Sequence, residues 1–285
     1  MSPRSSARRL LYLMEKGIQA ARYASLPEPE DGWPILLGIS FPKSGTHLLD
    51  QILVGFSKVG PFSRRLHSFH AEYEGESGEK RSERQALDWL AALRPRDVGS
   101  AHLFSRPDVV RKVLTPEFVA YFIYRDPRDV AVSHAFYVSD MASRHVHHDY
   151  YASLPDFETR LTVSILGRPD ADVEFPNIAE RFAPYGAWLE HPEVMKIHFE
   201  DLVADRSTTL GAIVRHLTRR APLPLAEATI VRALEISINP ARSPTFRSGK
   251  TGEWRKYFTP QHRRLFKSVA GDLLMRLGYE TSDNW

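Results

Sequence analysis

The sequence predicts a single α/β domain in which helices flank a central parallel β-sheet. Three apolar stretches are typical of buried strands: Ile35–Phe41, Phe118–Tyr124 and Val194–Phe199. Segments of helical periodicity separate them, and strands that alternate with helices favour a parallel sheet covered on both faces. No linker of domain scale follows Pro34. We therefore expect an N-terminal helix and linker over residues 1–33 and one domain over residues 34–285.

The remaining elements follow from apolar spacing and capping residues. Arg84–Leu93 predicts a short helix, and Asp97–Phe104 a short strand or strand end. Asn177 is expected to cap a helix with Phe182, Tyr185 and Trp188 on one face. Residues Ser63–Glu83 read as a long loop, and Met141–Ala171 as irregular or weakly helical. Further helices are expected over Leu210–Leu217, Ala226–Ile236 and Thr259–Leu277.

Composition narrows the class of protein. The chain has 285 residues, of which 42% are hydrophobic and 26% charged, as in a globular protein with a full core. A net charge of +3 does not call for a nucleic-acid partner. The absence of cysteine excludes disulfides and thiolate metal sites, and we expect a cytoplasmic location.

No apolar run approaches the ~20 residues of a membrane helix, so we expect no transmembrane segment. The first helix is expected to pack on the domain, with membrane-surface contact as the alternative.

The end of the first strand has the layout of a phosphate-binding turn. Lys43, Ser44, Gly45 and Thr46 follow Pro42 and precede a helical apolar pattern. Backbone N–H groups in such a turn, together with the helix N-terminus, favour an anion. The Walker A pattern needs a glycine directly before the lysine, so this is a P-loop-like turn. Taken alone, it could also be a strand–turn–helix that binds nothing.

Two later stretches could bind the same anion. Arg125 ends a strand, at the edge where α/β sheets bind their ligands, and Ser133 follows two helical turns later. Asp126 and Pro127 are predicted as the cap and first residue of that helix. Alternatively, Arg125 simply pairs with Asp126 or Asp129. Phe246–Trp254 carries two glycines and two basic residues, and Arg255 follows directly, which suits an anion-binding loop or a plain surface turn.

Together these three stretches, in order from residue 41 to residue 254, resemble the sulfotransferase family that uses 3′-phosphoadenosine 5′-phosphosulfate (PAPS). The resemblance implies PAPS as donor cosubstrate and His102, within Ser-Ala-His-Leu, as the catalytic base. It also implies that the turn after the first strand binds the 5′-phosphosulfate and that the arginine–serine pair binds the 3′-phosphate. The third stretch would form a loop that closes over this phosphate. The implied donor-binding residues are Lys43, Ser44, Gly45, Thr46, His47, Leu48, Arg125, Ser133, Phe199, Arg247, Ser248 and Gly249.

The chemistry agrees with these roles. A hydroxyl (or amine) acceptor is a poor nucleophile until a base removes its proton, and histidine titrates near the working pH. Charge develops on the departing phosphate, so a cation there, Lys43, favours the transition state. The sulfuryl group in transfer carries less negative charge than a phosphoryl group does. We therefore expect that the reaction requires no metal ion.

Several positions depart from the family pattern. Ser100 stands where lysine is frequent, Leu48 where a tryptophan stacks on adenine, and Phe199 where tyrosine is usual. Ser248 replaces a lysine, which leaves Lys250 and Arg255 as substitutes. A dimer motif is altered by Pro260 and Arg264, so that dimer is doubtful.

The acceptor is expected to be a small molecule bound by the loops Ser63–Glu83 and Met141–Ala171. Their aromatic and histidine content points to an apolar or aromatic alcohol. His67, Phe69, His70 and Tyr73 are candidates to line its site. His145, His147 and His148 could form a wall of that pocket, a metal cluster or plain surface. His134 is interpreted as structural or surface-exposed.

Two other functions remain open at this stage. One is a nucleotide or small-molecule kinase built on the same turn, although Pro42 speaks against it. The other is a non-catalytic protein that binds 3′-phosphoadenosine 5′-phosphate (PAP), which the missing lysine and tryptophan would favour.

Overall fold

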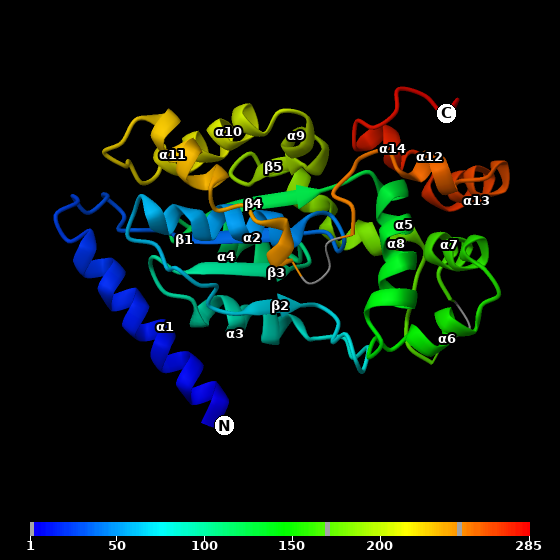
Figure 1. Ribbon diagram of the computed structural model, residues 1–285, viewed down its shortest axis with the longest axis horizontal. Coiled ribbons are helices and arrows are strands. Elements are labelled where there is room, and N and C mark those ends of the chain that lie inside the picture. The colour runs from blue at the N-terminus through cyan, green and yellow to red at the C-terminus, as the bar shows by residue number, and fades with distance from the viewer. Residues whose placement is uncertain (1–2, 169–171, 244–246) are drawn as a thin grey trace.

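The chain folds around a five-stranded parallel sheet with strand order β2-β3-β1-β4-β5 (Figure 1). The computed structural model describes residues 3–168, 172–243 and 247–285. The end of the region Met141–Ala171 and Phe246 lie outside the described residues. The strands are β1 (Ile35–Ser40), β2 (Phe69–Ala71), β3 (Val98–His102), β4 (Phe118–Tyr124) and β5 (Met195–His198).

Helices cover the sheet on both faces, as the sequence predicted. They are α1 (Pro3–Arg22), α2 (Thr46–Gly55), α3 (Glu83–Ala92), α4 (Pro107–Val113), α5 (Pro127–Phe136), α6 (His148–Ser153), α7 (Phe157–Leu166), α8 (Ile178–Phe182), α9 (Phe199–Ala204), α10 (Arg206–Thr218), α11 (Glu227–Glu235), α12 (Trp254–Tyr257), α13 (Pro260–Ala270) and α14 (Leu273–Arg276). A π-helical segment, Tyr137–Met141, continues α5, and short 3₁₀ turns lie at Phe56–Lys58, Ala183–Leu189 and Pro240–Arg242.

Alternate residues of β1 divide the core into two halves. Leu36 packs with α2, α10 and α11 on one face, and Leu37 packs with α3 and α4 on the other. Period-2 alternation of a strand that is buried on both faces produces this division. The strands run toward α5, α7 and α13, which lie beyond the carboxyl ends of β1 and β4 (Figure 1). Among the described residues, none of the helices is both long and apolar enough to cross a membrane.

The predicted caps are present where α5, α8 and α13 begin. Asp126 accepts a hydrogen bond from the Arg128 backbone N–H, and Pro127 is the first residue of α5. Asn177 and Thr259 each form a capping box at the start of α8 and α13. These side chains satisfy backbone N–H groups that a helix start leaves unpaired.

Two segments are more regular than the sequence suggested. The expected loop Ser63–Glu83 contains β2, a three-residue strand that pairs with β3 and is too short to give a periodic signal. The region Met141–Ala171 contains α7, a ten-residue helix capped by Asp156. Leu161 and Ile165 of α7 are fully buried, so tertiary packing stabilises a helix whose own sequence signal is modest.

Candidate active site

The turn after β1 is tightly packed against Phe199. Lys43 and Gly45 both have positive φ, 67° and 102°. A Cβ at position 45 would lie 2.7 Å from Phe199 Cδ2, so only glycine fits there without movement. The Ser44 hydroxyl is buried and has no hydrogen-bond partner among the described residues. A ligand at the turn would satisfy a buried polar atom of this kind.

Lys43 rests on an aromatic ring beside this turn. Its Nζ atom lies 3.7 Å from the centroid of Tyr137, the first residue of the π-helical segment. Burial, together with the positive charges of Arg125 and Arg247, lowers the pKa of Lys43 to about 7. Three cations therefore share one region, and a bound anion would relieve their repulsion.

His102 is fixed in orientation by β1. Its Nδ1 atom lies 3.0 Å from the Ser40 carbonyl oxygen and 3.1 Å from the Ser40 hydroxyl. The same hydroxyl lies 2.9 Å from the Thr46 hydroxyl in the phosphate turn. Because a carbonyl oxygen only accepts, Nδ1 carries the proton of the neutral ring, and Nε2 keeps a free lone pair.

The surroundings of His102 keep it neutral. Burial lowers its pKa to about 4, and the charge of Lys43 acts in the same direction. The hydrogen bond to the Ser40 carbonyl opposes this shift. The imidazole packs edge-on against Phe69 of β2, with 4.9 Å between the ring centroids. His102 is thus a neutral base at physiological pH.

Arg125 occupies the end of β4 as predicted. Its Nη2 atom donates to Asp129 at 3.2 Å and to the Lys250 carbonyl at 2.6 Å. Its guanidinium lies over the Phe199 ring at 4.6 Å, and its buried Nε has no partner among the described residues. The ion pair with Asp129 is thus present, but Arg125 is buried rather than a surface decoration.

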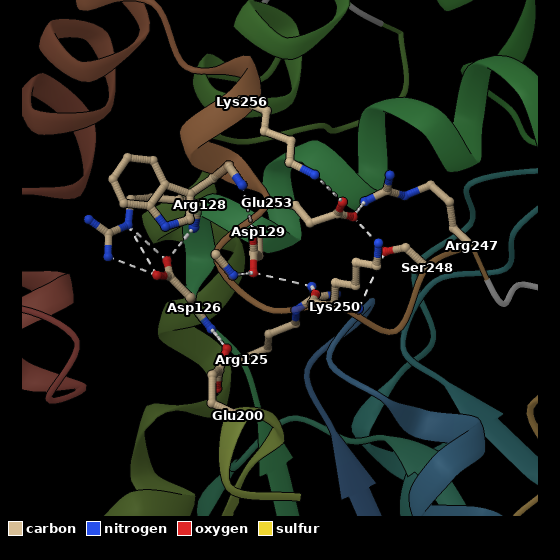
Figure 2. Close-up of polar contacts among 12 residues, drawn as sticks. Arg125, Asp126, Arg128, Asp129, Glu200, Arg247, Ser248, Lys250, Glu253 and Lys256 are labelled. Atoms are coloured by element: carbon tan, nitrogen blue, oxygen red, sulfur yellow. Dashed lines mark hydrogen bonds and ion pairs between the residues drawn. The ribbon is translucent and has the colours of Figure 1, made fainter. Parts of the chain in front are cut away.

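The loop after residue 246 is tied to α5 by Asp129 (Figure 2). Asp129 accepts hydrogen bonds from the backbone N–H groups of Gly252 and Trp254, each at 2.8 Å. Within the loop, Glu253 accepts from Arg247 at 2.7 Å and from Ser248 at 2.5 Å (Figure 2). The two arginines expected to bind the 3′-phosphate therefore both have carboxylate partners in the free site: Arg125 pairs with Asp129, and Arg247 with Glu253.

One cavity of about 1020 Å³ brings the predicted residues together. Of the predicted site residues, only Ser44 is missing from its lining, since its side chain is fully buried. The lining includes Lys43, Gly45, Thr46, His47, Leu48, His102, Arg125, Ser133, Phe199, Arg247, Ser248 and Gly249. Segments up to 206 residues apart in the sequence thus line the same cavity.

Aromatic side chains form a further part of the cavity lining, together with charged ones such as Glu72 and Arg81. The aromatic residues are Phe69, Tyr73, Phe104, Phe175 and Tyr185. The prediction for His70 was wrong, because β2 alternates: Phe69 and Ala71 face the cavity, whereas His70 packs on Trp89. The prediction for His67 was also wrong, since its Nδ1 atom pairs with the neighbouring Ser68 hydroxyl and it does not reach the lining.

Three more histidines lie in or near this wall. His145 and His147 line the cavity, whereas His148 bonds the Val138 carbonyl and does not. His134 is both structural and exposed to the cavity, since its Nδ1 atom lies 3.1 Å from the Ser164 hydroxyl. Within the described residues, no group of three or more potential ligands is arranged to hold a metal ion.

The departures from the family pattern have different surroundings. Leu48 lines the cavity near Val203 and Ile238. Ser100 is buried with its hydroxyl unpaired among the described residues. Neither Lys250 nor Arg255 lines the cavity, and Arg255 lies over the Trp254 ring at 4.6 Å. Neither side chain therefore takes the place of the lysine that Ser248 replaces.

Sequence reasoning did not identify three residues that organise the site: Ser40, Asp129 and Tyr137. Ser40 looked like an ordinary strand residue, and only the pairing of β1 with β3 brings it to His102. Asp129 was named only as a possible partner of Arg125, and its contact with a loop more than a hundred residues away was missed. Tyr137 carries no motif that marks it as a partner of Lys43.

Solved structures of other proteins share the fold of this chain. Mouse sulfotransferase SULT7A1, complexed with PAP, has a similar structure: TM-score 0.57, 18% identity, and coverage of 88% of this chain and 86% of that one. Retinol dehydratase in complex with androsterone and inactive cofactor PAP gives a TM-score of 0.55, 19% identity, and coverage of 92% and 85%. At these identities the likeness concerns the fold.

A further structure of retinol dehydratase, in a complex with retinol and PAP, gives a TM-score of 0.53 at 19% identity, with coverage of 93% and 86%. A search of curated protein sequences gave no match. The model of the family described as "Sulfotransferase domain" matches residues 35–278. The chain therefore belongs to the sulfotransferase domain family.

Proposed function

We propose that this protein transfers a sulfuryl group from PAPS to the hydroxyl group of a small, apolar or aromatic acceptor. The observation that carries the proposal is the position of His102. Its Nδ1 atom is held by Ser40, and the ring borders a cavity that both the cationic turn and several aromatic side chains line. A base at this position can remove the proton from an acceptor while the turn binds the donor.

The donor end has groups suited to two phosphates. The Ser44 hydroxyl and Arg125 Nε are buried donors without partners among the described residues, and phosphate oxygens would satisfy them. Lys43, Ser44, Gly45 and Thr46 would hold the 5′-phosphosulfate. Arg125, Ser133, Arg247, Ser248 and Gly249 would hold the 3′-phosphate. A second phosphate on the same ligand favours PAPS over ATP.

The adenine would be held by aliphatic side chains in place of a stacked tryptophan. Leu48, Val203 and Ile238 line the donor end of the cavity. The Gln51 side chain pairs with the backbone of Asn239 in both directions, at 2.6 and 3.0 Å, which fixes the Ile238 segment against α2. These surfaces offer an apolar slot at the entrance to the phosphate turn.

In the reaction, His102 Nε2 removes the proton from the acceptor hydroxyl. The acceptor oxygen forms a bond to sulfur while the bond from sulfur to the 5′-phosphate oxygen breaks. Lys43 Nζ moves from the Tyr137 ring to the oxygen that gains charge. The products are the sulfated acceptor, PAP and one proton. General base catalysis contributes about 10²–10⁴-fold in such steps. No step needs a metal ion.

The aromatic part of the cavity lining supports an apolar acceptor. Phe69, Tyr73, Phe104 and Tyr185 offer ring surfaces, and apolar surfaces gain affinity from buried area. Structural relatives have been crystallised with retinol and with androsterone, two apolar compounds. Because the sequence has no cysteine that would need an oxidising compartment, a cytoplasmic location is part of the proposal.

The proposal is tested by incubating the protein with PAPS and a panel of phenols, terpenoid alcohols and sterols. We expect sulfated products from some members, and none when ATP replaces PAPS. Phosphorylated products formed from ATP would identify a kinase instead. Tight binding of PAP with no transfer to any acceptor would make the protein a non-catalytic nucleotide-binding protein.

A further inference from the structure

Helix α1 attaches to the domain through its polar side. Tyr12 and Lys16 both bond the carboxylate of Asp97, with the Lys16 Nζ atom at 2.6 Å. One and two turns further, the buried Gln19 donates to the backbone carbonyls of Ser57 and Gly60, and Tyr23 donates to the carbonyl of Lys58. These residues recur at helical spacing, so they form one face of α1.

The opposite side of α1 is apolar and faces solvent. Its large side chains keep about half or more of their surface exposed: Leu10 60%, Leu11 49%, Leu13 53%, Met14 56% and Ile18 62%. Leu10, Met14 and Ile18 follow one another at intervals of one turn and form a continuous stripe. Scattered exposed apolar residues are normal, but a stripe along one helix marks a contact surface.

The amphipathic arrangement of α1 is therefore reversed relative to a helix that covers its own domain. Such a helix normally buries its apolar stripe against the core and exposes its polar face. Figure 1 shows α1 at the edge of the molecule, with its N-terminal end directed away from the sheet. Because hydrogen bonds and the pair with Asp97 hold the polar face, the stripe is left for another surface.

The charge of α1 indicates which kind of surface the stripe contacts. Five basic residues and one acidic residue give α1 a formal charge of +4, against +3 for the whole chain, so the helix accounts for the positive balance of the protein. Arg9 and Arg22 are exposed, one turn from Leu13 and Ile18 respectively. Glu15, the acidic residue, is paired with Arg65 of the domain at 2.6 Å.

This charge pattern disfavours a second copy of the chain as the occupant. Two α1 helices brought together by their stripes would set two strongly positive segments side by side. An anionic lipid surface accepts both features at once, since apolar side chains enter the headgroup boundary while arginines meet lipid phosphates. We propose that α1 binds the protein to anionic phospholipid membranes through the stripe Leu10, Leu11, Leu13, Met14 and Ile18.

The direct test is co-sedimentation of the whole protein with vesicles. The protein is expected to bind vesicles of phosphatidylcholine mixed with phosphatidylserine at least about tenfold more tightly than vesicles of phosphatidylcholine alone. Binding should weaken with added salt, because screening reduces the attraction. Equal binding to both vesicle types, or no binding to either, would overturn the proposal.

Variants test whether the stripe itself is responsible for membrane binding. Leu10→Ser combined with Met14→Ser should reduce binding to the mixed vesicles by about tenfold or more, because apolar side chains anchor such helices. Arg9→Glu combined with Arg22→Glu should do the same. Ile236→Ser is the matched control, since Ile236 is 68% exposed but lies beyond α11. It should bind as the wild type does.

Two outcomes would count against the stripe even if the wild type binds vesicles. One is unchanged binding of the Leu10→Ser, Met14→Ser variant. The other is a stable dimer in light scattering that this variant converts to a monomer, which would identify a second copy as the occupant. Circular dichroism and the melting temperature verify that each variant is folded. None of these measurements depends on sulfuryl transfer.

Discussion

The carboxylate of Asp129 accepts the backbone N–H of Trp254 at 2.8 Å, and it also pairs with Arg125 at 3.2 Å. One buried side chain therefore fixes both the base of the closing loop and the arginine assigned to the 3′-phosphate. Carboxylates that accept several hydrogen bonds at once are expensive to remove, because their donors stay buried without partners.

Asp129→Ala should therefore lower the free energy of unfolding by about 3 kcal/mol, because it leaves a buried cation and two backbone donors unpaired. It should also weaken PAP binding, since Arg125 and the loop lose their fixed positions. Urea unfolding and calorimetric titration with PAP measure the two effects. Asp108→Ala, which removes an exposed partner of Arg111, is the control. Wild-type affinity for PAP in the Asp129 variant would refute the anchoring role.

Ser40 is expected to act as a positioning residue for His102. Removal of its hydroxyl in Ser40→Ala leaves the carbonyl contact intact but loosens the imidazole and the Thr46 contact. We expect kcat to fall by about 3–10-fold, which is the loss of roughly one hydrogen bond, with KM for the acceptor little changed. Steady-state kinetics at saturating PAPS checks this. A change in KM alone would show that Ser40 shapes the acceptor site instead.

The pH dependence of kcat/KM should lack a limb near pH 6.5. Burial and the charge of Lys43 lower the pKa of His102 to about 4, so the base stays neutral down to that pH. Activity should fall only as the pH approaches this value, because protonation removes the lone pair. Because the pKa is below its unfolded value, protonation also favours unfolding between pH 6.5 and 4.

A histidine NMR titration of the free protein measures the same pKa directly. Lys43→Met should raise the pKa of His102, because it removes a nearby positive charge. An unchanged titration in this variant would show that the two residues do not interact.

Binding of PAP should be coupled to proton uptake by Lys43. Burial, together with Arg125 and Arg247, lowers the pKa of Lys43 to about 7 in the free site, and phosphates will raise it. Near pH 8, PAP binding should then take up a proton, and the affinity should fall as the pH rises above 7. Calorimetry in buffers of different ionisation enthalpy counts the protons. Lys43→Met should abolish this uptake, and uptake that persists would assign it elsewhere.

Leu48→Trp should increase the affinity for PAP. Leu48 lines the cavity, and the family resemblance implies a tryptophan that stacks on adenine at its position. An aromatic ring at that position adds about 0.5–1.5 kcal/mol beyond its buried area. Titration with PAP measures the gain, and Leu48→Ala should show a loss. A lower affinity in Leu48→Trp would show that the adenine lies elsewhere.

Much of the fold could be predicted because its signals are local. The strands β1 and β4 are continuous apolar runs, and α5 begins with a capping aspartate and proline. The motif residues were found for the same reason: each stretch carries its own glycine, lysine or arginine pattern. The rule that parallel strands present their carboxyl ends at one edge places the first two stretches together, and the family resemblance adds the third.

The missed features depend on contacts between distant segments. β2 is stabilised by pairing with β3, and α7 by packing of Leu161 and Ile165, so neither is evident in a short window. His70 and Phe69 are neighbours in sequence, and only the register of β2 decides which faces the cavity. The contact of Asp129 with Trp254 likewise exists only once both segments are folded.

The most direct test compares sulfuryl transfer by the wild type and His102→Ala at saturating PAPS. Turnover should fall by at least about 10²-fold, since a general base contributes that much. The affinity for PAP should stay within a factor of about two, because His102 takes no part in holding the phosphates. His148→Ala, which alters a histidine outside the cavity lining, should keep its activity. Turnover of His102→Ala at the wild-type rate would contradict the assignment of His102 as the base.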